Sequence, residues 1–239
     1  MTVSNLALAE VCAGTYQPGA TPQWQDSVKL THVYLQVVDG IHTIAWEGTT
    51  DWQEWLFSDF AALAVPVFSH PQLGPVHAGM VRDVLSVKDA ISAYLASIGW
   101  PPYYNTGHSK GAGEALLFHG LMLGDGHPPL CTRAYEAPRV GSWILKDYLA
   151  KEDIEQTQTK NVHGADIVTL VPPALVASEW CDVRTPIALT VPDDYSIAQK
   201  HRIPAVIEAL QRLEDLNKFK AALNQPKPMN VALMGQGQN

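Results

Sequence analysis

The 239-residue sequence has few cysteines, few charged side chains and no long hydrophobic run. No stretch approaches the roughly 20 consecutive apolar residues of a membrane-spanning helix, so the sequence predicts no transmembrane segment. Cys12, Cys131 and Cys181 are odd in number and far apart, which argues against a disulfide framework and is typical of a reducing compartment. Their spacing does not fit a metal site either. We therefore expect an activity that needs no metal and no other cofactor.

The charge of the chain is modest and not concentrated. Its 16 basic and 24 acidic residues give a net charge of −8, and no Lys/Arg cluster stands out. We therefore expect no nucleic-acid partner. Residues 1–13 contain Glu10 and no basic residue before their apolar part, so we do not interpret them as a secretory signal. The expected location is the cytoplasm, unless the sequence is already mature or the protein leaves by another route.

The length suits one domain, and the hydrophobic pattern predicts alternating strands and helices. Helical patterns cover residues 4–17, 81–98, 111–123 and 203–223. Strand patterns cover residues 33–38, 41–46, 102–106, 131–137, 159–162 and 185–191, and Asp39-Gly40 predicts a hairpin between the first two. The expected fold class is α/β, a mostly parallel sheet with helices on both faces, over residues 1–224. Residues 225–239, with two prolines, are typical of a loose tail.

Gly107-His108-Ser109-Lys110-Gly111 matches the pattern G-x-S-x-G. In that pattern the serine sits on a sharp turn between a strand and a helix, and the flanking glycines remove side chains that would collide there. The following helix directs backbone N–H groups at developing negative charge. A strand pattern precedes the segment and a helical pattern follows it, which favours a nucleophilic Ser109. The alternative is an ordinary glycine-rich turn before a helix.

Residues 106–112 also resemble the T-G-H-S-L-G-G segment of class 3 lipases, the fungal triacylglycerol lipase family of α/β-hydrolases. Four further segments resemble motifs of that family and occur in its order. They are residues 46–50 (W-E-G-T-T, for F-R-G-T/S), 76–80 (V-H-A-G-M, for V-H-x-G-F), 135–141 (Y-E-A-P-R-V-G, for F-G-S-P-R-V-G) and 166–173 (for D-I-V-x-x-L-P-P). The chain departs from the family at Lys110, Glu47 and Glu136, where the family has leucine, arginine and glycine.

The resemblance and the order of residues along the chain indicate the acid and the base that would serve Ser109. α/β-Hydrolases place the residues in the order serine, acid, histidine. The resemblance points to Asp166 as the acid. His201 is then the only downstream histidine, because His163 precedes Asp166. By position, three other aspartates remain alternatives for the acid: Asp182, Asp193 and Asp194.

The oxyanion hole needs two hydrogen-bond donors. The backbone N–H of Lys110, directly after the nucleophile, would be one. The resemblance implies that Thr49 supplies the other through its N–H and hydroxyl, unless Thr49 merely ends the hairpin strand. We interpret His77 and His108 as structural, since neither stands in the right order for a base.

Residues 51–63 carry an aromatic and aliphatic stripe at helical spacing, including Trp52, Trp55 and Leu56. The resemblance implies a lid over the acyl-binding cleft, with these residues in contact with substrate. A stripe of this kind can equally pack on the core, and the sequence leaves both readings open. A lid favours water-insoluble acyl chains and transient contact with a lipid interface, whereas a fixed helix favours short soluble esters.

The sequence thus predicts a serine hydrolase, a lipase or esterase that cleaves small-molecule or lipid carboxylic esters through an acyl-enzyme on Ser109. Phospholipase, feruloyl esterase and polyesterase activities on the same triad remain alternatives. A non-catalytic binding protein of the same fold is disfavoured, because the set of serine, aspartate and histidine is complete.

Overall fold

A computed structural model describes residues 3–26, 31–49, 64–171 and 180–223. Its centre is an eight-stranded sheet in the order β1-β2-β3-β6-β7-β8-β10, with β9 paired to β8. The strands are Trp24–Gln25 (β1), His32–Val38 (β2), Ile41–Trp46 (β3), Tyr103–His108 (β6), Cys131–Tyr135 (β7), Ile154–Asn161 (β8), Gly164–Ala165 (β9) and Ile187–Thr190 (β10). The pairs from β3 to β10 are parallel, which confirms the predicted fold class.

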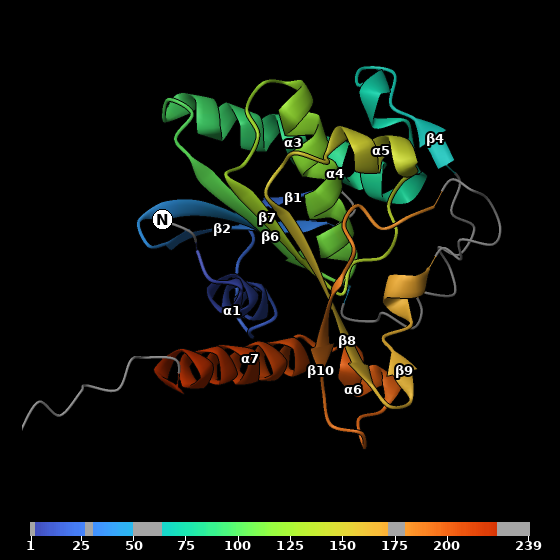
Figure 1. Cartoon of the computed structure of the whole chain (residues 1–239). Coiled ribbons are helices and arrows are strands. Elements are labelled where there is room, and N and C mark those ends of the chain that lie inside the picture. Colours follow the sequence, from blue (N-terminus) through green and yellow to red (C-terminus); the bar gives the residue numbers. More distant parts are fainter. Residues whose placement is uncertain (1–2, 27–30, 50–63, 172–179, 224–239) are drawn as a thin grey trace, which may run out of the picture.

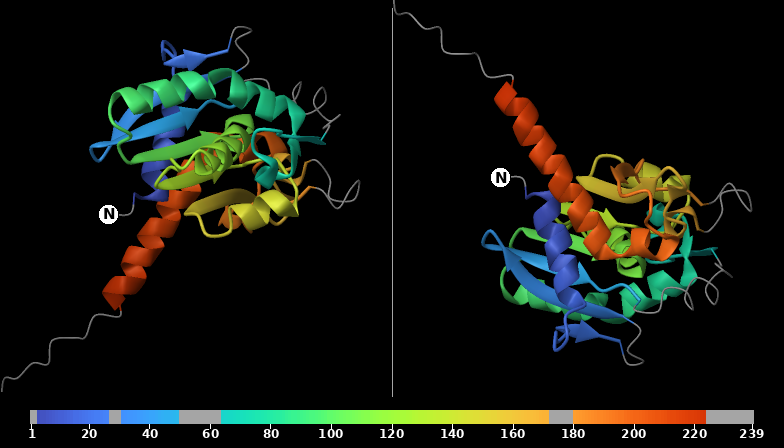
Figure 2. Two further views of the ribbon diagram at one scale, coloured as in Figure 1. Left: turned by 90° about the horizontal axis from the view of Figure 1, so that it is seen from above. Right: turned by 90° about the horizontal axis from the view of Figure 1, so that it is seen from below.

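Helices cover both faces of this sheet (Figure 1). They are Asn5–Thr15 (α1), Ala78–Ser97 (α3), Lys110–Gly124 (α4), Trp143–Tyr148 (α5), Ile197–His201 (α6) and Ile203–Leu223 (α7), with short 3-10 turns at Pro71–Leu73 (η1) and Val168–Leu170 (η2). α3, α4 and α5 lie on one face, and α1 and α7 lie side by side across the other (Figures 1 and 2). A small second sheet pairs Ala64–Pro66 (β4) with Pro75–His77 (β5).

The strand β6 shows why two helical layers form. All six of its residues are buried, as expected for a parallel strand covered on both faces. One core lies between the sheet and the α3/α4 layer, and includes Trp46 and Phe118. The other lies under α1 and α7, and includes Leu8 and Val206. The strand that precedes the proposed nucleophile is therefore held rigidly in the middle of the molecule.

The hairpin between β2 and β3 forms where the sequence predicts it. Asp39 has φ 51° and Gly40 has φ 79°, so both turn residues adopt the left-handed conformation that a tight two-residue hairpin requires. Val38 and Ile41 pair across the turn. The hairpin fixes the register of β3, whose carboxyl end carries the segment with Thr49.

Two predicted strands are shorter than the strands observed. The strand expected at 102–106 continues to His108, because Gly107 still pairs with Trp46 on one side and Ala134 on the other. The strand expected at 159–162 overlaps only the last three residues of β8, whose polar sequence I-E-Q-T-Q-T-K-N gives no clear hydrophobic alternation. The lid segment 51–63 and the tail 225–239 lie outside the described residues.

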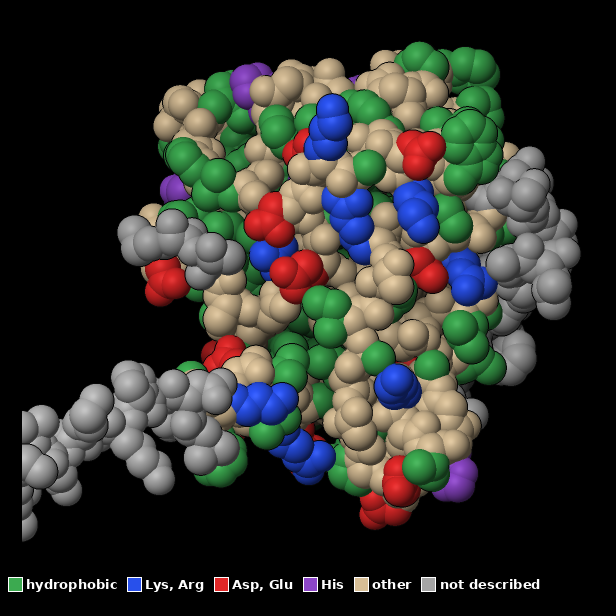
Figure 3. All heavy atoms as spheres, viewed as in Figure 1, with side chains coloured by type: hydrophobic (Ala, Val, Ile, Leu, Met, Phe, Trp, Pro, Cys, Tyr) green, Lys and Arg blue, Asp and Glu red, His purple; other side chains and the backbone are tan. Residues whose placement is uncertain are grey.

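On the face seen in Figure 3, basic and acidic side chains are mixed rather than separated into patches of one sign. Within the described ranges, no helix has both the length and the apolar character needed to cross a membrane.

Candidate active site

Ser109 lies at a sharp turn between β6 and α4. Its backbone has φ 58° and ψ −129°, a conformation that ordinary residues rarely adopt. Its N–H donates to the carbonyl of Tyr135 at 2.9 Å, which ties the turn to the neighbouring strand. A side chain at Gly111 would collide with the carbonyl oxygens of Trp46 and Glu47 on β3 and just after it. Gly111, two residues after Ser109, is therefore needed for the close approach of α4 to the sheet.

The structure brings Ser109, His201 and Asp166 together in a hydrogen-bonded row. Oγ of Ser109 lies 2.8 Å from Nε2 of His201, and Nδ1 of His201 lies 2.6 Å from Oδ2 of Asp166. Because Nδ1 faces a carboxylate, it carries the ring proton, which leaves Nε2 as the acceptor for the serine hydroxyl. The N–H of Val168 donates to the other oxygen of Asp166 at 3.2 Å. This geometry lets the histidine take a proton from the serine.

Burial and charge set the state of the acid. Ser109, His201 and Asp166 are almost completely buried. Burial alone would raise the pKa of Asp166, but the hydrogen bond and charge of His201 outweigh it and lower that pKa. Asp166 is thus held as a carboxylate, which is the form that can orient the histidine. The N–H of Asp166 donates to Thr159 on β8 at 3.0 Å, so the acid is anchored to the sheet.

The alternative acids lie in other surroundings. Asp182 lies 3.6 Å from Arg139 in an ion pair. Asp193 accepts a hydrogen bond from the N–H of Val162 at 3.3 Å, and Asp194 is exposed. The geometry therefore favours Asp166 among the four aspartates.

The segment with Thr49 runs alongside the nucleophile. A Cβ on Gly48 would lie 2.9 Å from Cβ of Ser109, so the chain passes as close as a glycine permits. Thr49 follows directly and lines the same cavity as His201. Lys110 is the first residue of α4, where backbone N–H groups point out of the helix. Both predicted oxyanion donors therefore belong to segments that border Ser109.

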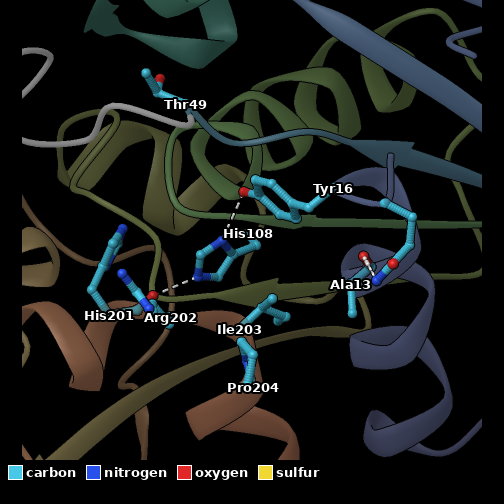
Figure 4. A pocket seen from close by; sticks show the side chains of 9 residues that line it. Ala13, Tyr16, Thr49, His108, His201, Arg202, Ile203 and Pro204 are labelled. Atoms are coloured by element: carbon cyan, nitrogen blue, oxygen red, sulfur yellow. Dashed lines mark hydrogen bonds between the residues drawn. The ribbon is translucent and has the colours of Figure 1, made fainter. Parts of the chain in front are cut away.

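Tyr16 and His108 connect the parts of this site, a role that the sequence did not reveal. Nε2 of His108 lies 2.7 Å from the carbonyl oxygen of His201 and donates to it. Nδ1 of His108 is then an acceptor for the hydroxyl of Tyr16 at 2.9 Å, and that oxygen accepts from the N–H of Gly48 at 2.9 Å (Figure 4). Burial lowers the pKa of His108 to about 3, so its ring is neutral. His108 therefore positions the backbone of His201, in line with a structural role.

The side chain of Lys110 turns away from the nucleophile into a buried ionic group. Its Nζ lies 2.8 Å from Asp83 on α3 and 2.9 Å from Glu114, one turn further along α4. We call Lys110, Asp83 and Glu114 the lysine cluster. Burial raises the pKa of Glu114 to about 7, although Lys110 acts to lower it. Burial acts to lower the pKa of Lys110, but Glu114 and Asp83 outweigh it and raise that pKa above its usual value. The cluster couples the start of α4 to α3.

Glu136, at the family's glycine position, lies next to Asp166 and His201. It directly follows β7 and has φ 54°, which suits glycine better than glutamate. The N–H of Thr159 donates to its Oε1 at 2.8 Å. One carboxyl oxygen each of Glu136 and Asp166 and one ring nitrogen of His201 lie within 4.8 Å of one another. We call Glu136 and Asp166 the carboxyl pair.

These three residues are, in the part of the chain that the structure describes, the group whose spacing could suit a metal ion. Their atoms are already used differently, because His201 and Asp166 share a 2.6 Å hydrogen bond. The chemistry that this row supports is proton transfer, and the independence from metal expected from the sequence stays a prediction.

A cavity of about 340 Å³ lies beside the row (Figure 4). Its lining combines apolar and polar side chains from α1, the nucleophile turn and the start of α7. It is formed by Ala13, Tyr16, Gln17, Thr49, His108, His201, Arg202, Ile203 and Pro204. This volume is in the range of small-molecule sites. Trp52, Trp55 and Leu56, which we expected to contact substrate, lie outside the described residues.

The sequence matches the family described as lipase (class 3) over residues 43–176. The chain belongs to the class 3 lipase family. The matched range includes Thr49, the turn with Ser109, and Asp166, and it ends before His201. As a class 3 lipase, the protein is a serine hydrolase of carboxylic esters. Comparison with curated proteins gives no match.

Solved structures of fungal lipases share the fold of this class 3 lipase. A mono- and diacylglycerol lipase from Aspergillus oryzae superposes with a TM-score of 0.66 at 17% identity, covering 82% of each chain. A mutant form of MDLA from Penicillium cyclopium gives 0.60 at 20% identity, over 82% of this chain and 81% of that one. The triacylglyceride lipase of Rhizomucor miehei gives 0.58 at 21% identity, over 80% and 78%. These structures support the α/β-hydrolase fold.

Proposed function

We propose that this class 3 lipase hydrolyses lipid esters through an acyl-enzyme on Ser109. Oγ of Ser109 attacks the ester carbonyl carbon while Nε2 of His201 accepts its proton. Asp166 keeps the proton of Nδ1 in place and stabilises the imidazolium that forms. The backbone N–H of Lys110 and the N–H and hydroxyl of Thr49 bind the oxygen as it becomes negative.

The second half of the cycle uses the same groups in the reverse direction. The imidazolium of His201 gives its proton to the departing alkoxide, and the alcohol leaves. A water molecule then loses a proton to His201 and attacks the acyl carbon, and the carboxylic acid is released as Oγ of Ser109 regains its proton. No step needs a group beyond the chain itself and water.

The support for this proposal is one observation above all: the 2.8 Å contact of Ser109 with His201, which itself lies 2.6 Å from Asp166. Ser109 also adopts the unusual backbone conformation that projects a nucleophile from the sheet. A purely structural serine would have no need for that strain. The roles of Thr49 and of the amide of Lys110 are supported by their position at the edge of the same turn.

We propose that the acyl chain or the alcohol group of the substrate enters the cavity next to His201. Ile203, Pro204 and Ala13 give this cavity an apolar side, and Gln17 and Arg202 give it a polar side. Such a mixed lining suits an ester with one apolar and one polar end. Transient contact with a lipid interface is part of the proposal and depends on residues 51–63, outside the described ranges.

The test is hydrolysis of p-nitrophenyl esters from acetate to palmitate by the wild type and by Ser109→Ala. We expect Ser109→Ala to lose activity by up to about a million-fold, since the members of a triad act as a unit, and to keep its thermal unfolding temperature. The matched control is Ser97→Ala, which removes an exposed hydroxyl on α3 and should keep full activity. Substantial activity in Ser109→Ala would overturn the proposal.

A further inference from the structure

The side chain of Glu136 is completely buried beside the acid of the triad. Its Oε1 accepts a hydrogen bond from the N–H of Thr159, which anchors it to β8. Its Oε2 is also buried, and no N–H or O–H among the described residues donates to it. The carboxyl group of Asp166 lies beside that of Glu136, with one oxygen of each within 4.8 Å of the other. Two acceptor groups in contact make no hydrogen bond unless one of them carries a proton.

Electrostatics decides which member of the carboxyl pair carries that proton. Two adjacent buried carboxylates repel each other too strongly for both to be ionised. Asp166 is kept ionised by His201, whose Nδ1 lies 2.6 Å away, and its pKa is lowered against the effect of burial. Among the described residues, no lysine, arginine or histidine donates a hydrogen bond to Oε2 of Glu136. Burial, reinforced by the negative charge of Asp166, raises the pKa of Glu136 well above its usual value.

We propose that Glu136 is a protonated carboxylic acid that donates a hydrogen bond to Asp166, and that it positions the acid of the triad and moderates its charge. This inference rests on the proposed function, because it extends the row of hydrogen bonds behind Ser109 by one residue. Glu136 touches no substrate in this arrangement. It is a positioning residue that acts through Asp166 on His201.

The backbone of Glu136 supports a specific role. Its φ of 54° places a non-glycine residue where glycine is favoured, at a cost of order 1 kcal/mol. The class 3 lipase motif quoted above has glycine at this position. A side chain that only filled space would gain little from being buried, strained and polar. A side chain that donates a hydrogen bond to Asp166 accounts for all three properties.

A proton donor behind Asp166 has a measurable effect on the general base. A hydrogen bond to a carboxylate withdraws part of its negative charge, so Asp166 holds the imidazolium form of His201 less strongly. Among the described residues, the titratable groups next to Glu136 are Asp166, from the loop after β9, and His201, at the end of α6. Beyond His201 lies the neutral ring of His108, with its centroid 5.1 Å away. Lys200 points away, to Asn161 and Gly164.

Two variants of matched length separate the roles. Glu136→Gln keeps the shape and can donate an N–H to Asp166, but it cannot ionise. Glu136→Met keeps the length and the same backbone strain but has no donor. The measurement is kcat/KM against pH for a p-nitrophenyl ester that the wild type hydrolyses, together with thermal unfolding of each variant.

We expect the acidic limb of the Glu136→Met profile to move to higher pH by about one unit, because the general base keeps its proton longer. Its plateau should fall by on the order of 10-fold as Asp166 loses a positioning contact. Glu136→Gln should have the acidic limb and the plateau of the wild type. Rescue by glutamine and not by methionine would support a donor, since both fill the site.

Other outcomes would overturn the inference. If Glu136 were ionised, both variants would remove a negative charge, and both acidic limbs would move to lower pH. If Glu136 were merely structural, neither limb would move, and only the unfolding temperature would fall. Failure of the proposed function looks different, because the wild type would then have no Ser109-dependent hydrolysis with which to record a profile.

Unfolding gives a second readout that does not depend on activity. An acid whose pKa is raised by folding contributes stability that is fully present below its unfolded value, 4.5 for a glutamate, and lost as pH rises through its folded value. Wild-type stability should therefore fall relative to Glu136→Gln as pH rises from 5 to 9. An unchanged difference across that range would contradict a protonated Glu136.

Discussion

The lysine cluster and the carboxyl pair each bury two carboxyl groups. In the lysine cluster, Nζ of Lys110 lies between Asp83 and Glu114 at 2.8 and 2.9 Å. In the carboxyl pair, two carboxyl groups face each other and one of them is in contact with a histidine. In the lysine cluster an ammonium group compensates the buried carboxylates, whereas in the carboxyl pair we propose that a shared proton does so. The first arrangement suits a structural joint between α3 and α4, and the second suits a site that transfers protons.

The largest expected effect belongs to the carboxyl-pair side. His201→Ala should reduce turnover about as much as Ser109→Ala, on the order of a million-fold, because no other group can take the serine proton. Asp166→Asn should cost about 10,000-fold, since the amide holds the ring in the wrong tautomer. The matched control is His163→Ala, which alters an exposed histidine. Turnover near the wild-type value in His201→Ala would show that the base lies elsewhere.

Thr49→Val tests the proposed oxyanion donor in the segment next to Ser109. The change keeps the shape and the backbone N–H and removes only the hydroxyl. We expect turnover to fall about 100- to 1,000-fold with little change in KM, because the hydroxyl contributes when charge develops on the carbonyl oxygen. The unfolding temperature should hardly change. A lower unfolding temperature with normal turnover would instead assign Thr49 a purely structural role.

Asp83→Asn tests the lysine cluster, and its effect should fall on stability alone. Asp83 is 3% exposed, and its replacement by an amide removes one of the two carboxylates that contact the buried ammonium of Lys110. We expect a loss of about 3 kcal/mol in the free energy of unfolding, with turnover of the folded enzyme within a few-fold of the wild type. The control is Asp215→Asn, in an exposed pair with Lys218, which should change stability little. If Asp83→Asn shifted the pH profile of kcat/KM, the lysine cluster would also affect proton transfer, which would contradict a purely structural role.

The fold and the positions of Ser109, Asp166 and His201 could be predicted from the sequence, because their signals are local or depend on order along the chain. Asp39-Gly40 fixes a hairpin by turn chemistry alone. The helix pattern at 203–223 coincides with α7, since its apolar face recurs at regular intervals. Ser109 and His201 were found from a short motif and from chain order, and the structure places them 2.8 Å apart. Their roles in catalysis stay predictions.

The residues around Ser109, Asp166 and His201 could not be predicted from the sequence, because their contacts are tertiary. Asp83 lies near the start of the helical pattern 81–98, and its contact with Lys110 requires α3 to pack on α4. Tyr16 belongs to no motif in the sequence, and its hydroxyl hydrogen-bonds to His108, 92 positions away. Glu136 was visible as a departure from a family motif, but the sequence could not show that it faces Asp166. Such contacts leave no periodic trace in the sequence.

Labelling with a fluorophosphonate probe tests the central claim most directly, because the probe reacts with an activated serine and reports its position by mass spectrometry of the digested protein. We predict one adduct on Ser109 in the wild type, no adduct in Ser109→Ala, and labelling slowed by several orders of magnitude in His201→Ala. Loss of ester hydrolysis should follow the labelled fraction. An adduct on another residue, or continued hydrolysis by fully labelled enzyme, would contradict the assignment of Ser109 as the nucleophile.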